Sequence, residues 1–177
     1  LKGLLHDAVE NGHIECVKCF IDNGANVNEK NIFGQTPLHR AIYYDFLNCV
    51  ELLIKHRANV NSLDVGGMTP LHEASRCGRV ECINLLIRGG AIMNMKDDRG
   101  NNALHHLCYG FHNIPLTTFM ECMKCLIDSG EDAKSASQSG YTPIQAMPDS
   151  LKKEIIDYVD VAESFSVKKC SDEYSDE

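Results

Sequence analysis

A six-residue motif that recurs at nearly fixed spacing constrains this chain more than any other feature. It reads Gly-Gln-Thr-Pro-Leu-His at residues 34–39 and Gly-Met-Thr-Pro-Leu-His at residues 67–72, and two degraded copies follow at residues 100–105 and 140–145. The copies begin 33, 33 and 40 residues apart. Such a period is typical of an array of stacked units, each of which buries its apolar face only against its neighbours.

Two further motifs recur in phase with the first. An apolar-polar-Cys-apolar pattern stands in the second half of successive units, at residues 14–17, 47–50, 80–83 and 120–123. The first three units also close alike, at residues 23–28, 56–61 and 89–94. Together these segments resemble the ankyrin repeat family, whose unit consists of a turn, a Thr-Pro-Leu-His helix, a Gly-His turn, a second helix and a Gly-Ala-x-Val-Asn segment. The resemblance covers roughly residues 1 to 160.

The resemblance implies an all-α repeat solenoid, an ankyrin repeat array of about five units with β-hairpin or turn fingers. The expected units are a partial first unit, three full units and a truncated last unit, at residues 1–29, 30–62, 63–95, 96–135 and 136–162. Residues 163–177 carry five acids and two lysines but few core residues, so we expect an acidic, disordered tail there. The chain begins at Leu1, inside a repeat, which favours a monomeric array within a longer protein.

Unit four departs from the pattern by an insertion. Ten residues separate His72 from Cys82, whereas 17 separate His105 from Cys122, and the seven extra residues fall within the segment 110–118. Insertions in repeat arrays map to loops, and such loops often lie on a binding face. A binding role and a tolerated loop extension both stay open. The unit also has Asn102 and Ala103 in place of Thr-Pro, which predicts a weaker helix start.

Unit five has the pattern of a terminal repeat. Met147 and Pro148 cut its first helix short, and Ser150 is expected to cap a last helix. The apolar positions expected to face the array are Leu151, Ile155, Ile156 and Val159. The other positions of this helix are largely charged, which suits a unit whose outer face meets water.

Nine cysteines and two Cys-x-x-Cys motifs, at residues 16–19 and 122–125, suggest a metal or redox site at first sight. The repeat register argues against it, because the cysteines recur at one position of the second helices and one turn later. We expect them to pack as small buried apolar residues: Cys16, Cys49, Cys82, Cys122, Cys19 and Cys125. We therefore expect neither metal nor cofactor. So many unpaired cysteines favour an intracellular location, cytoplasmic and/or nuclear.

Three histidines occupy equivalent positions of the repeated motif. They are His39, His72 and His105, and the resemblance implies a structural role in which the imidazole bonds to backbone at the turn and between units. One histidine per repeat also places them too far apart to share a metal ion. His106, which follows His105 directly, adds one imidazole that the repeated motif does not use.

Composition limits the classes of partner. The formal net charge is −8, from 17 basic and 25 acidic residues, which argues against nucleic-acid phosphate and favours a basic or neutral protein partner over an acidic one. Ordinary solubility is the competing interpretation. No apolar run approaches the roughly 18 residues of a membrane span, and no signal peptide is evident, so we expect no membrane association.

The resemblance places partner binding on the concave strip formed by the finger tips and the exposed side of the first helices. Carried over position by position, the candidate partner-binding residues are Phe33, Gln35, Tyr43, Tyr44, Met68, Arg76, Asp98, Arg99, Tyr109 and Tyr141. Further positions of the same strip are Glu10, Asn11, Ile32, Val65, Cys77, Asn101 and Gln138. Aromatic residues, Met and Arg are enriched at interfaces, although Ile32 and Phe33 could instead pack against adjacent fingers.

These observations favour a non-catalytic protein–protein interaction module that binds a protein or peptide, as a substrate receptor or adaptor in a larger protein. No nucleophile elbow, phosphate loop or spaced carboxylate pair supports an enzyme. The second helices resemble those of substrate receptors of ubiquitin ligases; an inhibitor or cofactor of a transcription factor and a pathogen effector stay open. A regulatory segment of a larger enzyme or channel is the alternative from another class, and a metal-binding protein is a remote third.

Overall fold

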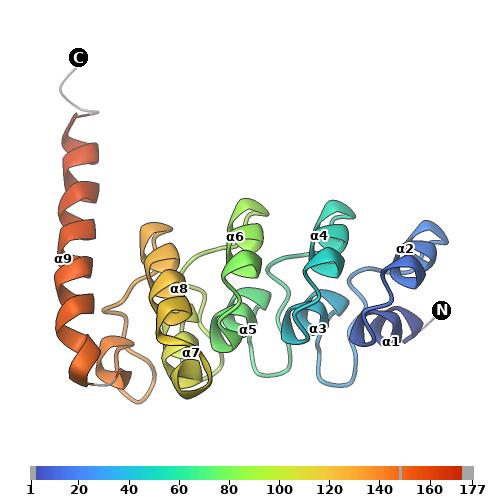
Figure 1. Cartoon of the computed structure of the whole chain (residues 1–177), viewed down its shortest axis with the longest axis horizontal. Helices are drawn as coiled ribbons and strands as arrows, with labels where there is room; N and C mark the ends of the chain where they lie inside the picture. The colour runs from blue at the N-terminus through green and yellow to red at the C-terminus, as the bar shows by residue number, and fades with distance from the viewer. Residues whose placement is uncertain (1–2, 148, 173–177) are drawn as a thin grey trace.

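The structure, a computed structural model, describes the backbone of residues 3–147 and 149–172 and the side chains as far as residue 162 (Figure 1). Its helices are α1 (Leu4–Glu10), α2 (Ile14–Asp22), α3 (Pro37–Tyr43), α4 (Leu47–Lys55), α5 (Pro70–Cys77), α6 (Val80–Arg88), α7 (Ala103–Gly110), α8 (Leu116–Asp128) and α9 (Asp149–Asp172), with short 3-10 helices η1 (Phe111–Asn113) and η2 (Ile144–Ala146). These described residues contain no β-strand. The predicted all-α solenoid is confirmed.

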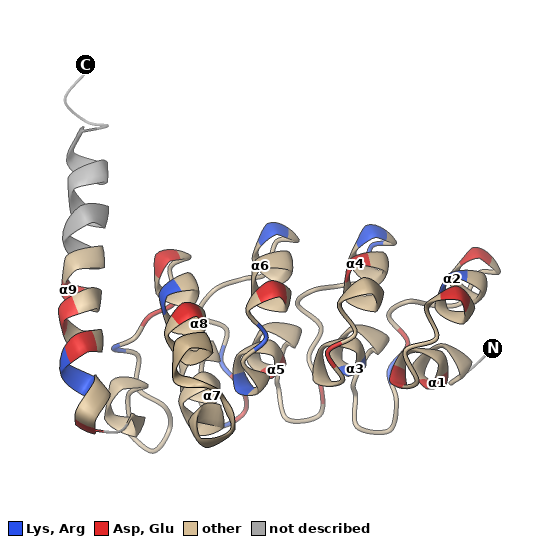
Figure 2. Cartoon of the chain, in the orientation of Figure 1, with Lys and Arg blue, Asp and Glu red and all other residues tan. Residues whose placement is uncertain are grey.

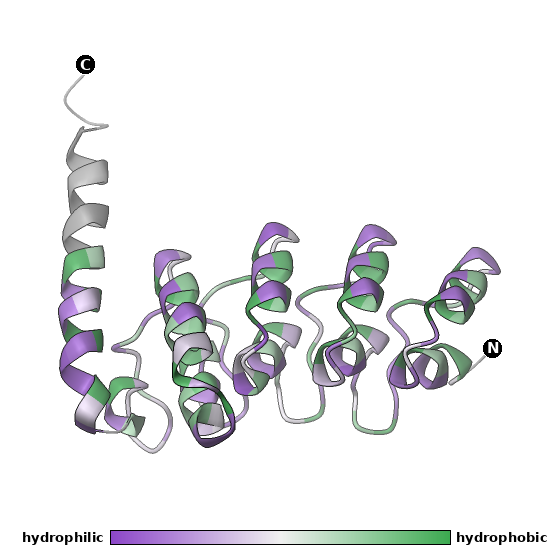
Figure 3. Cartoon of the chain, in the orientation of Figure 1, coloured by the Kyte–Doolittle hydropathy of each residue, from purple (hydrophilic) through white to green (hydrophobic). Residues whose placement is uncertain are grey.

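The helices form two layers (Figure 1). The first helices α1, α3, α5 and α7 lie side by side in one layer, and the second helices α2, α4, α6 and α8 lie in the other. The leucine of each motif is buried between units, as are the apolar residues that follow each second-helix cysteine: Leu5, Leu38, Leu71, Leu104, Val17, Val50, Ile83 and Met123. Hydrophobic residues accordingly line every helix from α1 to α8 (Figure 3), and the core is one continuous strip along the array.

Each finger is a tight turn closed by its own backbone. The fingers comprise residues 31–35, 64–68, 97–101 and 137–141, and in each the N–H of the first residue donates to the C=O of the last at 2.9 to 3.0 Å. Neighbouring fingers are also joined, since Val65 N–H donates to Phe33 C=O and Asp98 N–H donates to Gly66 C=O. Gly34 has φ 71°, and a Cβ there would come within 2.8 Å of Val65 N, so only glycine fits between two fingers.

The first helices are capped and tied to the next unit by the same histidine. Thr36 with His39, and Thr69 with His72, form capping boxes in which the imidazole accepts from the cap backbone N–H. On the other side of each ring, Nε2 lies 3.2 Å from Met68 O for His39 and 3.0 Å from Met95 O for His72. The expected structural role of these histidines is confirmed.

Unit four keeps its cap despite the changed motif. Asn102 Oδ1 accepts from His105 N–H at 3.3 Å and lies 2.6 Å from His105 Nδ1, while Asn102 Nδ2 donates to Asp132 C=O. His105 Nε2 lies 2.9 Å from Tyr141 O. The prediction of a weaker start to this helix was wrong with respect to the cap, because asparagine is as good an N-cap as threonine.

The cysteines of the second helices are buried, as predicted, only in the interior units of the array. Cys49, Cys82 and Cys122 are at most 1% exposed, whereas Cys16 and Cys19 on α2 are exposed. The prediction of burial was wrong for this pair because no described helix covers that face of α2. Cys125 is half-buried, and its thiol donates to Asn84 Oδ1 at 3.1 Å.

This difference predicts a pattern of thiol reactivity. Iodoacetamide added to the native protein is expected to alkylate Cys16 and Cys19 at least about 10-fold faster than the buried cysteines, because alkylation needs an accessible thiolate. Burial raises the pKa of the Cys82 and Cys122 thiols to about 12. Peptide mass spectrometry measures the rate at each site, and denaturant, as the control, should equalise the rates. Equal rates in the native protein would contradict the burial described above.

The seven extra residues of unit four do not form a loop. They build η1 and lengthen α8 to 13 residues, where α4 and α6 have nine. Ile114 is 8% exposed and packs against Gly78, and the ring of Phe111 meets the buried ring of Phe119 edge-on at 4.9 Å. The prediction of a loop at residues 110–118 was therefore wrong, because these apolar side chains extend the core.

Unit five ends the array as a terminal repeat. Its first helix is reduced to η2, and α9 presents Leu151, Ile155 and Val159 to the array, whereas Ile156 is 41% exposed, contrary to prediction. Ser150 lies inside α9, which begins at Asp149, so it does not cap the helix. The helix continues to Asp172, into the segment expected to be a disordered tail, and residues 173–177 lie outside the described residues. The division of the chain at residue 162 stays a prediction.

Candidate functional site

Two tyrosines at the end of α3 form the centre of the exposed first-helix layer. Tyr43 is 43% exposed and Tyr44 39%, and their rings meet edge-on with centroids 5.1 Å apart. The Arg40 guanidinium lies 5.1 Å from one ring centroid and 4.9 Å from the other, and its Nε donates to Glu10 Oε1 at 2.8 Å. These contacts fix the orientation of the rings although both stay accessible.

Arg76 continues this cluster from the neighbouring helix α5. Its guanidinium lies 5.8 Å from the Tyr43 ring centroid and donates to Glu73 Oε1. Glu73 is only 5% exposed, and it also accepts from the Cys77 thiol at 3.7 Å. Burial, with the nearby Glu73 charge, raises the pKa of Cys77 to about 11, so this thiol stays protonated and is no candidate nucleophile.

The fingers of units two and three add apolar tips beside these helices. Ile32 is 88% exposed, Phe33 58% and Val65 70%. In Figure 2 the turns of these two fingers are tan, the colour of residues other than Lys, Arg, Asp and Glu, and the finger of unit two is green in Figure 3. Two predicted site residues are less available: Met68 is half-buried, and Gln35 is half-buried with its Oε1 accepting from Arg40 Nη1 at 3.3 Å. Both side chains therefore make contacts within the array and are only partly accessible to a partner.

The fingers of units four and five are polar instead. Asp98 and Arg99 are exposed at one tip, Tyr141 is 60% exposed beyond the next, and Tyr109 is 52% exposed at the end of α7. A pocket of about 360 Å³ lies between these two fingers and the end of α7. It is lined by Arg99, Asn101, Tyr109, Gln138 and Ser139. Asn101 is only 4% exposed, so its assignment to the surface strip was wrong.

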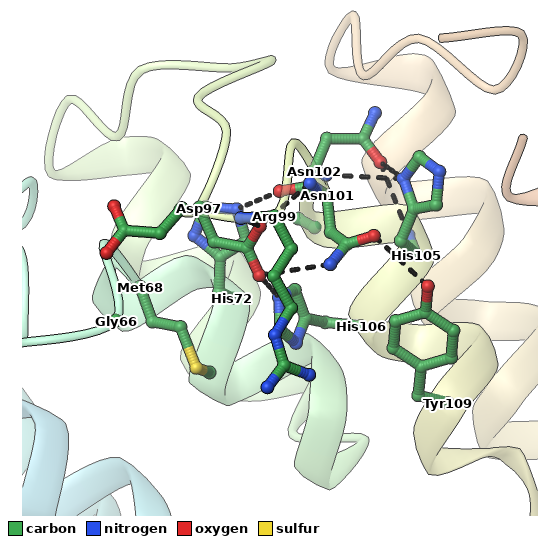
Figure 4. Close-up of polar contacts among 12 residues, drawn as sticks. Gly66, Met68, His72, Asp97, Arg99, Asn101, Asn102, His105, His106 and Tyr109 are labelled. Carbon is green, nitrogen blue, oxygen red and sulfur yellow. Dashed lines mark hydrogen bonds and ion pairs between the residues drawn. The ribbon is translucent and has the colours of Figure 1, made fainter. Parts of the chain in front are cut away.

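Asn101 is buried because it belongs to a polar network that the repeat pattern does not predict (Figure 4). Asn101 Nδ2 donates to Asp97 Oδ2 at 3.1 Å, and the same oxygen accepts from His106 Nε2 at 2.9 Å. The Tyr109 hydroxyl donates to Asn101 Oδ1 at 3.1 Å. The ring of His106 also meets that of His72 edge-on, with centroids 5.0 Å apart. The network therefore joins α5, α7 and the finger between them.

The charge states in this network follow from burial and hydrogen bonding. Burial alone raises the pKa of the Asp97 carboxyl, but donors from the Asn101 backbone and side chain, His106 and the Arg99 backbone hold it below its ordinary value. Burial lowers the pKa of His106, although the bond to Asp97 opposes this. The network at neutral pH is thus a carboxylate that accepts from a neutral imidazole protonated at Nε2.

The sequence holds a partial signal for this network. Asp97 opens its finger as Asn31 and Asp64 open theirs, and each of these side chains accepts from backbone N–H groups of its own turn. A fingertip carboxylate or amide was therefore foreseeable. That His106 points at Asp97 was not, because the pairing depends on how α7 lies against its own finger and has no counterpart in the other units.

Four of the predicted site residues, Tyr43, Tyr44, Arg76 and Tyr109, are joined along one row. Tyr44, Tyr43 and Arg76 are in ring and cation contact, the charges of Arg76 and Glu73 act on His106, and the ring of His106 lies edge-on to Tyr109 at 6.0 Å. We call this set the first-helix row. Phe33, Asp98 and Arg99 lie on the fingers beside it, and Tyr141 lies on the last finger, where its backbone carbonyl oxygen is 2.9 Å from His105 Nε2.

Membrane-spanning and metal-binding features can be assessed for residues 3–147 and 149–172. No helix there is long and apolar enough to cross a membrane. Among the same residues, no group of three or more His, Cys, Asp or Glu side chains is arranged to hold a metal ion.

The family model described as ankyrin repeats (3 copies) matches residues 5–97, which is more than half of the chain. The chain belongs to the ankyrin repeat family. Members of this family are generally protein–protein interaction modules and are typically non-catalytic. A search of curated proteins finds no match to this chain. The matched region covers the first three units, and the structure continues the same stack through units four and five.

Proposed function

We propose that this array binds one protein or peptide partner along the first-helix row and the fingers beside it, as a substrate receptor or adaptor within a larger protein. The observation that carries the proposal is the pair Tyr43 and Tyr44, two aromatic rings left exposed at the α3 end of the row and held in place by Arg40 and Arg76. Tyrosine and arginine are the residue types that dominate binding energy at interfaces.

The row is suited to binding because its side chains are already ordered. A partner that binds flexible side chains loses free energy when it immobilises them, at about 0.5–1.5 kcal/mol for each. Here ring contacts, cation–π contacts and the ion pair of Arg40 with Glu10 restrict the aromatic rings before any partner arrives. The apolar tips at Ile32, Phe33 and Val65 add surface that a partner can cover.

The proposed partner is basic or neutral overall, since the chain carries a formal net charge of −8. The unpaired cysteines support a reducing compartment, the cytoplasm and/or the nucleus. Neither feature names the partner.

The test is a quantitative affinity capture from cell lysate with a variant carrying Tyr43→Ala, Tyr44→Ala and Arg76→Glu. We expect partners recovered by the wild type to be depleted at least about 10-fold, since loss of central aromatic and arginine anchors commonly costs 2 kcal/mol or more. The matched control is Arg88→Glu, because Arg88 is an exposed arginine at the end of α6, in the other layer. This variant should recover the same proteins as the wild type.

Both variants are compared with the wild type for thermal stability before capture, so that loss of folding is separated from loss of contact. If the triple variant, equally stable, recovers the same proteins in the same amounts, the first-helix row is not the binding surface.

A further inference from the structure

The pocket between the fingers of units four and five has a defined chemistry. Arg99 and Asn101 come from one finger, Gln138 and Ser139 from the next, and Tyr109 from the end of α7. Its volume of about 360 Å³ suits one side chain of a partner rather than a folded element. It lies at one end of the first-helix row, because Tyr109 is the last member of that row.

Arg99 is the one residue with a formal charge among those that line the pocket. No described acidic side chain lies within ion-pair distance of its guanidinium. Asp98 turns away to the neighbouring finger, where its Oδ1 fills the space beside Gly67. Asp97 lies beneath Asn101, and its charge is already met by four hydrogen bonds. The lining of the pocket therefore carries one positive charge, that of Arg99, above a buried Asp97 carboxylate whose oxygens already accept hydrogen bonds.

The base of the pocket is fixed before a ligand arrives. Asn101 is 4% exposed and is held from two sides, by Asp97 and by the Tyr109 hydroxyl. Burial, together with the nearby Asp97 charge, raises the pKa of that hydroxyl, and the positive charge of Arg99 partly opposes the rise, so the hydroxyl stays protonated and continues to donate to Asn101. In Figure 4 the Arg99 side chain extends from its finger in front of His106.

The rim of the pocket offers further hydrogen-bond donors. The Ser139 hydroxyl lies 2.9 Å from that of Ser137, which is buried outside the lining, and when Ser137 donates in this pair the Ser139 proton stays free for a ligand. The ring of Tyr109, which is 52% exposed, provides an apolar wall. A planar group with negative charge on short methylene groups fits this combination better than an ammonium group or a purely apolar side chain.

We propose that this pocket, the Arg99 pocket, receives the side-chain carboxylate of an aspartate or glutamate of the partner. The carboxylate accepts from the Arg99 guanidinium and a rim hydroxyl, while its methylene groups lie against the Tyr109 ring. The inference rests on the proposed function, since it names what the partner presents at this end of the same surface. A basic or neutral partner that carries one acidic residue at this point is then aligned along the surface in one register. Other registers would place a basic residue of the partner beside Arg99, and the two like charges would repel.

The test is an NMR titration of the whole ¹⁵N-labelled protein with N-acetyl-glutamate amide. We expect saturable shifts of the Arg99 Nε–H signal and of the Gln138 and Ser139 amides, with a dissociation constant in the millimolar range. The matched probe N-acetyl-glutamine amide has the same shape without the charge, and it is expected to give no saturable shift at these signals.

Two variants complete the titration. Arg99→Gln keeps the backbone bonds of its finger and is expected to abolish the shifts of Gln138 and Ser139, whereas Arg88→Gln, an exposed arginine on α6, should leave them intact. Absence of saturable shifts in the wild type, equal shifts with the glutamine probe, or shifts that persist in Arg99→Gln would each overturn the inference. The titration uses no partner and no contact with Tyr43 or Tyr44, so its failure leaves the proposed function standing, and the reverse also holds.

Discussion

Replacing Gly110 by alanine is expected to lower the free energy of unfolding by about 2 to 3 kcal/mol, as overpacking of a tight site does. Gly110 ends α7, and a Cβ built on it would lie 2.1 Å from the carbonyl oxygen of Arg76 at the end of α5. The obstacle is backbone, so no side-chain rotation relieves it and the two helices must move apart. Helix propensity alone predicts the opposite, a gain of about 1 kcal/mol.

The measurement is urea unfolding followed by circular dichroism. Gly66→Ala is the matched control, because the nearest heavy atom to a Cβ there is the Asp64 side-chain oxygen at 3.5 Å, an ordinary contact. We expect the control to unfold within about 0.5 kcal/mol of the wild type. A Gly110→Ala protein as stable as the control would mean that α5 and α7 are not packed as closely as described.

Lowering the pH from 7 to 4 is expected to remove several kcal/mol of stability. Burial lowers the pKa of His72 from 6.5 to about 4, and it lowers the pKa of His39, His105 and His106 as well. Between pH 6.5 and the folded-state pKa the unfolded chain therefore binds more protons than the folded chain, so stability falls as pH falls. For His72 alone the difference corresponds to about 3 kcal/mol at pH 4.

Carboxyl groups modify this pH profile without reversing it. Asp97 has a lowered pKa, so the stability it contributes is lost only at still lower pH, as the carboxylate is protonated in the folded state. Burial raises the pKa of Glu131, which works in the opposite direction, since its protonation as pH falls removes a buried charge. Glu131 is a single group, whereas four histidines reduce the stability as the pH falls, so the expected net effect is a loss of stability.

His72→Gln tests the histidine origin of this dependence. Glutamine retains a capping partner at this position, as Gln145 does in unit five, where its Oε1 accepts from Thr142 N–H at 2.9 Å. Urea unfolding at several pH values between 7 and 4 should show a shallower loss of stability in the variant, although the variant is less stable at pH 7. An unchanged slope would exclude His72 as a source of the acid sensitivity.

Local features of the fold were predictable from the sequence because they repeat. Thr-Pro at a helix start, a histidine three residues after the cap and a glycine at the finger each perform a function set within a few residues, and the 33-residue spacing shows that the units stack. The same periodicity identified the buried leucines and the interior cysteines. It also placed Tyr43, Tyr44, Arg76 and Tyr109 on the exposed side of the first helices, where the structure has them.

Features of the candidate site that depend on single side-chain contacts were not predictable in this way. Asn101 stands at a finger position expected at the surface, yet Asp97 and Tyr109 hold it in the interior. The pairing of His106 with Asp97 has no counterpart in the other units, so no repeat pattern carries it.

The sequence by itself determined the family, the number and order of the units, and the face that each helix turns to its neighbours. Only the tertiary structure decided that residues 111–128 extend the core, that Cys16 and Cys19 are exposed, that Gly110 meets Arg76, and that a pocket lined by Arg99 forms between two fingers. The reason is physical. Capping, turns and amphipathic faces depend on residues a few positions apart, whereas these four features depend on side chains or backbone brought together from different units, or on the absence of a covering one.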